Sequence, residues 1–104
     1  MKHKEALRKR KKLVDSLPSA DEILRGSLMQ RIIRHKKGCP KCAAGGGHPV
    51  WILTVAYPGG TSKQYSIRQE MKPQVEQWIQ NYHELKAQLE EICELNLVLV
   101  RPDE

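Results

Sequence analysis

A loop rich in cysteine, histidine and glycine is the feature of this sequence that most constrains its fold. Its ligand-type side chains stand in the pattern H-x3-C-x2-C-x5-H, formed by His35, Cys39, Cys42 and His48. A tetrahedral zinc ion takes four nitrogen or sulfur ligands, and a C-x2-C pair delivers two thiolates to one ion from a single tight turn. Glycines on both sides of the cysteines allow the backbone to wrap around a point centre. Because protein fills all four positions, the pattern predicts a structural zinc ion, Zn2+, and not a catalytic one.

Two other interpretations of the loop stay open. The C-P-K-C segment has the form of a dithiol redox site, but such sites lie at a helix N-terminus, and here Ala43, Ala44 and three glycines follow. The segment also fits a glycine-rich loop with two free thiols. Cys39 and Cys42 are the central pair of the zinc interpretation. His35 decides whether the site is closed, because a zinc ion with one protein ligand fewer keeps a position for water.

The composition supports a small domain that a metal ion stabilises. The chain has 104 residues, 39% of them hydrophobic, and no phenylalanine, so its core has few large side chains and gains from a metal ion. Three cysteines cannot form a complete disulfide framework, which favours a reducing cytosol. The charged start and the lack of any run of 18 apolar residues predict neither a secretion signal nor a membrane span.

The positive charge is concentrated in the N-terminal part of the chain. The formal net charge is +6, but residues 1–42 hold 13 Lys or Arg against 4 Asp or Glu, whereas residues 43–104 hold 5 against 8. Seven basic residues and one acid lie in residues 2–12. We therefore predict a basic N-terminal arm or helix over residues 1–18, followed by a domain over residues 19–104. The arm either contacts phosphates or is a solvated terminus.

Two short elements are predicted between the basic arm and the loop. Ser19 and Glu22 have the spacing of a capping box, which predicts a short helix that Gly26 would end as a C-terminal cap. For residues 27–34 both strand and helix fit the apolar spacing, and two β-branched isoleucines favour the strand.

A β-hairpin is predicted after the loop. Residues 50–57 are rich in β-branched and aromatic side chains, residues 58–60 read P-G-G, and residues 63–67 alternate polar with apolar. Two strands alone are marginal in water, so residues 27–34 are the expected third strand. This arrangement would place the Cys/His loop between two strands, as in a zinc ribbon. The predicted fold class is α+β: a small antiparallel sheet of two to three strands, a short N-terminal helix and a long C-terminal helix.

The last third of the chain predicts one long helix over residues 73–101, about 43 Å in length. An eight-residue strand spans only about 26 Å, so the apolar end of this helix needs cover from the N-terminal helix or from a second subunit. The inner positions of the helix follow the alternation of three and four that is typical of a coiled-coil seam, with one asparagine among them. They are Val75, Trp78, Tyr82, Leu85, Leu89, Ile92, Asn96 and Leu99.

The order of these landmarks resembles a family of small prokaryotic domains often met in mobile-element settings, with the pattern G-S-L, then C-G-K-x-x-C-x-C, then H-G-P-Y-Y. The resemblance covers roughly residues 22–101. Cys42 and His48 match the last cysteine and the histidine of the pattern, and His35 stands where the first cysteine usually lies. Here a proline replaces the middle cysteine, Cys39 is shifted by one position, and P-V-W replaces G-P-Y. The resemblance implies the fold and a metal site whose ligands have moved, but no activity.

The charge and the loop together favour a nucleic-acid-binding accessory protein, which the resemblance would place in a mobile-element nucleoprotein complex. RNA or single strands are favoured over a duplex, because no basic helix has the features of a groove-reading helix. Phosphates would pair with cations of the arm and loop, and a base would stack on an aromatic ring. The candidate residues are Arg8, Lys9, Arg10, Lys11, Lys12, Arg31, Arg34, Lys36, Lys37, Lys41 and Trp51.

The alternative function is a protein-interaction module. The C-terminal helix would form a homodimer or dock on a larger protein through the seam from Trp78 to Leu99, and the zinc loop would only stabilise the fold. An enzyme is not expected. The carboxylates are spread along the polar side of the last helix, and no phosphate-binding glycine motif occurs.

Overall fold

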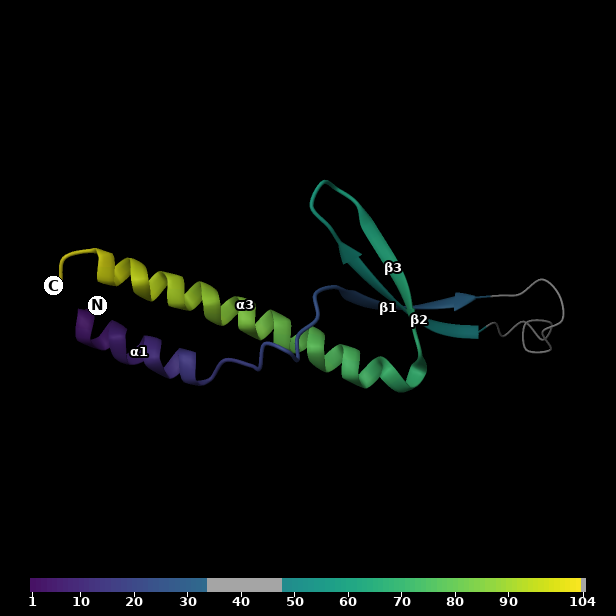
Figure 1. Ribbon diagram of the computed structural model, residues 1–104, viewed down its shortest axis with the longest axis horizontal. Helices are drawn as coiled ribbons and strands as arrows, with labels where there is room; N and C mark the ends of the chain where they lie inside the picture. The colour runs from purple at the N-terminus through teal and green to yellow at the C-terminus, as the bar shows by residue number, and fades with distance from the viewer. Residues whose placement is uncertain (34–47, 104) are drawn as a thin grey trace. The chain divides into compact units, whose positions relative to one another are not determined.

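The described part of the chain folds into one helix, a sheet and a second, longer helix. The structure, a computed structural model, describes residues 1–33 and 48–103. Helix α1 (His3–Asp15) precedes the strands β1 (Ser27–Ile33), β2 (His48–Ala56) and β3 (Ser62–Ile67), and a 3-10 turn (Gln69–Met71) leads into helix α3 (Lys72–Val100) (Figure 1). The predicted α+β fold is confirmed. Neither helix in the described part of the chain is both long and apolar enough to cross a bilayer.

The three strands form one antiparallel sheet in the order β1-β2-β3. Leu53 of β2 lies opposite Leu28 of β1 on one side and opposite Tyr65 of β3 on the other. Gly59 and Gly60 give the hairpin turn backbone angles φ of 92° and 85°, which glycine adopts without strain. Both the predicted hairpin and its third strand are confirmed.

The described chain divides into two compact units, and α3 contributes to both. One unit is Leu24–Ile79, and the other combines Met1–Ile23 with Gln80–Glu104. In the sheet unit the core consists of Leu53, Val55 and Val75, each at most 7% exposed, with four partly buried side chains packed against it: Leu24, Leu28, Ile67 and Ile79. The alternation along β2 sends every second side chain into this core, against the first two turns of α3.

The helical unit pairs α1 with the C-terminal part of α3, as Figure 1 shows. The His3 backbone N–H donates to Asp103, Arg10 donates to Asn96 and Gln88 donates to Ser16, over 3.0, 2.9 and 3.2 Å. Ala6, between these points on the same face of α1, is completely buried. The N-terminal helix therefore provides cover for the apolar half of α3, which is one of the two covers predicted from the length of that helix.

The helix predicted after the capping box is wrong. Residues 17–26 contain a turn, in which the Glu22 N–H donates to the Ser19 carbonyl over 3.1 Å, but no helix. The backbone instead bonds to α3: the Leu24 N–H donates to the Trp78 carbonyl, and Asn81 donates to the Glu22 carbonyl. These bonds satisfy groups that a helix would have bonded internally, so tertiary contacts override the local capping signal.

Gly26 is not a helix cap either, but the structure does require glycine there. It directly precedes β1 with φ of 151°. A Cβ added to it would lie 2.8 Å from Leu53 Cδ1 and 3.0 Å from the Thr54 carbonyl oxygen. Its role is to let the backbone approach β2 closely.

The buried stripe of α3 leaves the predicted seam in its C-terminal half. Leu89 is 47% exposed and Asn96 is exposed, whereas Leu95 is only 8% exposed and Gln88 is half-buried. In this half α3 packs against α1, to which Gln88 donates a hydrogen bond at Ser16, so the side that faces α1 sets the buried stripe. The other seam residues stay half-buried: Trp78, Tyr82, Leu85, Ile92 and Leu99.

Candidate nucleic-acid interface

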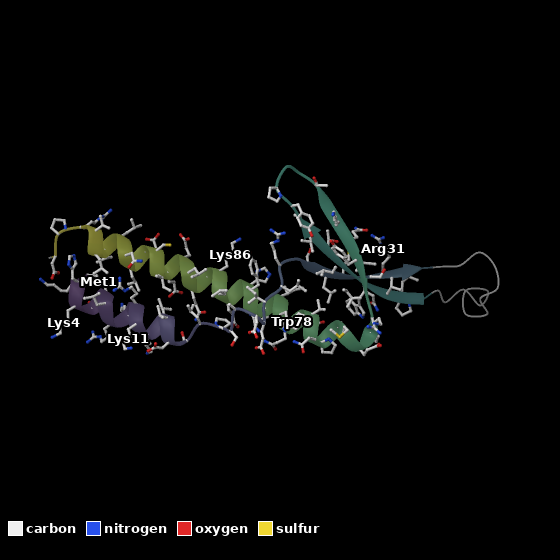
Figure 2. All side chains as sticks on the ribbon, viewed as in Figure 1. Met1, Lys4, Lys11, Arg31, Trp78 and Lys86 are labelled. Atoms are coloured by element: carbon white, nitrogen blue, oxygen red, sulfur yellow. The ribbon has the colours of Figure 1, made fainter. Side chains whose placement is uncertain are left out.

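Helix α1 presents a basic stripe on the side opposite its buried Ala6. Lys4, Arg8 and Lys11 recur at the helical spacing of four and three, and all are exposed. Figure 2 shows Lys4 and Lys11 extending away from α3. Lys11 forms one loose ion pair, with Asp15 at 3.6 Å, in which both side chains are more than 60% exposed. Within residues 1–33 and 48–103, Lys4 and Arg8 have no ion-pair partner.

The other predicted cations of α1 lie toward the flanks of the stripe. Lys9 pairs with Glu5 of its own helix at 3.4 Å. Arg10 faces α3, where Asn96 accepts its hydrogen bond. Lys12 is exposed beside the groove between the two helices. Of the five α1 cations predicted to contact phosphates, therefore, Arg8 and Lys11 lie on the outward stripe.

The structure separates Arg31 from Trp51, which were predicted to act together. Arg31 lies opposite Val50 and Trp51 lies opposite Gln30, so the two side chains project from different faces of the sheet. The Trp51 ring is also half-buried, its N–H donates to Gln69 over 3.0 Å, and the Lys72 ammonium sits 4.6 Å from the ring centroid. One face of the ring is therefore already in contact with a cation.

The predicted zinc loop lies almost entirely outside the described residues. His48 begins β2, with its backbone opposite Ile33. Among the side chains that the structure describes, no three histidine, cysteine or carboxylate groups come together to hold a metal. The zinc site stays a prediction, as do the loop cations. The predicted residues outside the described ranges are Arg34, His35, Lys36, Lys37, Cys39, Lys41 and Cys42.

An aromatic and cationic cluster that the sequence analysis missed lies beside the hairpin turn. Tyr57 and Tyr65 are 37% and 43% exposed, and their hydroxyl oxygens are 3.3 Å apart. The Arg25 guanidinium and the Lys63 ammonium lie 5.3 and 5.6 Å from the centroid of the Tyr57 ring. A hollow of about 500 Å³ adjoins the two tyrosines, with Leu24 among its apolar lining residues.

The register of the hairpin is the signal that would have found this cluster. Lys63 pairs with Val55 and Tyr65 pairs with Leu53, so these side chains share the face of the β2 core residues. Tyr57 continues the same alternation past the end of β2. Arg25, the fourth member, comes from an irregular segment and has no sequence signal.

The two tyrosine hydroxyls affect one another. The hydrogen bond to Tyr57, followed by loss of hydration and by repulsion from the Tyr57 oxyanion, raises the pKa of Tyr65 above its ordinary value. The Tyr65 phenol is therefore neutral at physiological pH. A neutral ring beside two cations has an exposed π-face and no negative charge that would repel phosphate.

Comparison of the chain with family models, with curated proteins and with solved structures gave no match. The resemblance to the prokaryotic Cys/His-loop domains stays a prediction.

Proposed function

We propose that this chain binds single-stranded nucleic acid, RNA or DNA, and that a structural zinc ion in the loop of residues 35–48 stabilises the fold. The observation that carries the proposal is the pair of exposed tyrosines, Tyr57 and Tyr65, with the cations Arg25 and Lys63 against the Tyr57 ring. Single-strand binders combine aromatic side chains, on which bases stack, with cations that track the backbone. No acidic residue lines the hollow next to this ring among the residues described.

The members of the cluster have different roles in this proposal. The Tyr57 ring orients the two cations. The Tyr57 hydroxyl orients Tyr65 through the hydrogen bond between the two hydroxyl groups. Tyr65 keeps its own ring available for a base. Arg25 and Lys63 then meet the phosphates on either side of that base.

The basic stripe of α1 adds sequence-independent affinity. Lys4 and Arg8, without ion pairs in the described chain, release counterions from phosphates with little competition from carboxylates. A duplex is disfavoured as the main target, because stacking on Tyr65 needs an unpaired base. The function is binding and not catalysis, in a reducing cytosol where the cysteines stay free of disulfides and can bind zinc.

The test is the affinity of purified protein for a fluorescently labelled single strand of mixed sequence, RNA or DNA, at low salt. Tyr65→Ala should weaken binding by roughly 1–3 kcal/mol, the usual worth of one base stacked on an aromatic ring. Tyr65→Phe is the matched control, because it keeps the ring and loses only the hydroxyl. No detectable binding by the wild type, or equal affinity for Tyr65→Ala, would refute the proposal.

A further inference from the structure

A groove runs along the helical unit between α1 and α3, with a volume of about 610 Å³. Its apolar lining includes Leu13 of α1 and Leu95 and Val98 of α3. Two packed helices bury only the side chains along their line of contact, and no further layer covers the groove beside that line. Apolar side chains in the groove therefore stay partly exposed to water.

The two walls of the groove carry opposite charges. Lys9 and Lys12 line it on α1, and Glu90, Glu91 and Glu94 line it on α3. No ion pair joins the two walls in the described part of the chain; the only partner of Lys9 is Glu5, on its own helix. Lys12 and the three glutamates therefore present charge that no ion pair neutralises in the described part of the chain, whereas Lys9 is shared with Glu5.

The charges of the two walls lie at the same level along the groove. The antiparallel helices are aligned by the bonds Gln88 to Ser16 and Arg10 to Asn96. Lys12 lies between positions 10 and 16 of α1, and the three glutamates lie between positions 88 and 96 of α3. When a second copy is placed over the groove, its lysines and glutamates lie at the same height along the helices as those of the first copy.

We infer that this groove is the interface of a homodimer in which α1 of each copy packs on α3 of the other. A two-fold axis parallel to the helices produces this arrangement, and it sets Lys9 and Lys12 of one copy against Glu90, Glu91 and Glu94 of its mate, twice over. A two-fold axis across the helices would instead set lysine against lysine and glutamate against glutamate. The charges therefore favour the first arrangement. The resulting dimer is a four-helix bundle, and the apolar floors of the two grooves form its core. This inference does not depend on nucleic-acid binding.

Charge exchange tests the dimer in the full-length chain. One variant carries Lys9→Glu and Lys12→Glu, and the other carries Glu90→Lys and Glu94→Lys. Each alone sets like charge against like charge at both contacts, so sedimentation should show a dissociation constant raised at least about tenfold. Mixing the two variants should restore a heterodimer with an affinity within a few fold of the wild type, because both contacts again join opposite charges. Circular dichroism checks that each variant keeps its helices.

Leu89→Glu is the control, because Leu89 is exposed on α3 but does not line the groove. It should leave the dissociation constant unchanged. A wild type that stays monomeric at high micromolar concentration overturns the inference. So does a mixture of the two charge variants that fails to associate while the wild type is dimeric, or a dimer that only Leu89→Glu disrupts, since the interface would then lie elsewhere.

Discussion

The Arg10 guanidinium donates a hydrogen bond to the Asn96 side-chain oxygen over 2.9 Å and thereby joins α1 to α3 across 86 positions of sequence. Because the bond lies at the surface, a double-mutant cycle with Arg10→Ala and Asn96→Ala should give a coupling energy of about 0.5 kcal/mol in the free energy of unfolding. Urea denaturation of the four proteins measures it. Strictly additive effects would show that the bond contributes nothing in solution.

Gly26→Ala should destabilise the sheet unit by more than about 1 kcal/mol, because the new methyl group meets Leu53 and the Thr54 carbonyl at a backbone angle unfavourable to alanine. Gly60→Asn is the control. Its φ is also positive, but nothing lies within 4 Å, and asparagine tolerates this region. Equal losses of stability in the two variants would remove the close-approach explanation.

Zinc should co-purify at one ion per chain, because four ligands from one loop bind the metal and stabilise the fold together. Cys39→Ser and Cys42→Ser should release the metal and lower the melting temperature, and His35→Ala should do so to a smaller extent. Metal analysis and thermal unfolding measure these effects. Protein produced with ample zinc that contains less than about a tenth of an equivalent would contradict the zinc site.

Tyr57→Phe should lower the pKa of Tyr65 toward the ordinary tyrosine value of about 10, because it removes the main cause of the rise. The raised pKa means that folding favours the neutral phenol. The resulting stability is present below about pH 10 and is lost as the pH rises through the folded-state pKa, where the unfolded chain ionises first. Ultraviolet absorbance of tyrosinate follows the titration. Tyr82→Phe should leave the pKa of Tyr65 unchanged, and an identical change in both variants would contradict the role of Tyr57.

Replacing Lys4, Arg8 and Lys11 together by alanine should flatten the dependence of log affinity on log salt by about 2 for a single strand, since each phosphate contact contributes about 0.7. Lys86→Ala, on the exposed surface of α3, should leave the slope unchanged. Fluorescence anisotropy across a salt series gives both slopes. A triple variant with the wild-type slope would exclude the α1 stripe as a phosphate contact.

The sheet was predictable because its signals are local. The β-branched run of β2, the P-G-G turn and the alternation of β3 agree with one another, and the length of α3 follows from its unbroken apolar periodicity. The helix after Ser19 failed because bonds from Leu24 and Glu22 to α3 involve residues more than 50 positions away. The Tyr57 and Tyr65 cluster was missed for a similar reason: its cation Arg25 is brought there only by the tertiary fold.

Helix α1 is anchored to α3 at His3, Arg10 and Ser16, with the fully buried Ala6 among them. Because the Ala6 side chain is a single methyl group, the two helices approach closely there. The basic segment is therefore a helix packed on α3 and not a loose tail. The backbone that carries its cations is ordered before any ligand arrives, and binding then loses less conformational entropy than the folding of a disordered arm would cost. Association through α1 should accordingly show a small heat-capacity change, without the signature of folding coupled to binding.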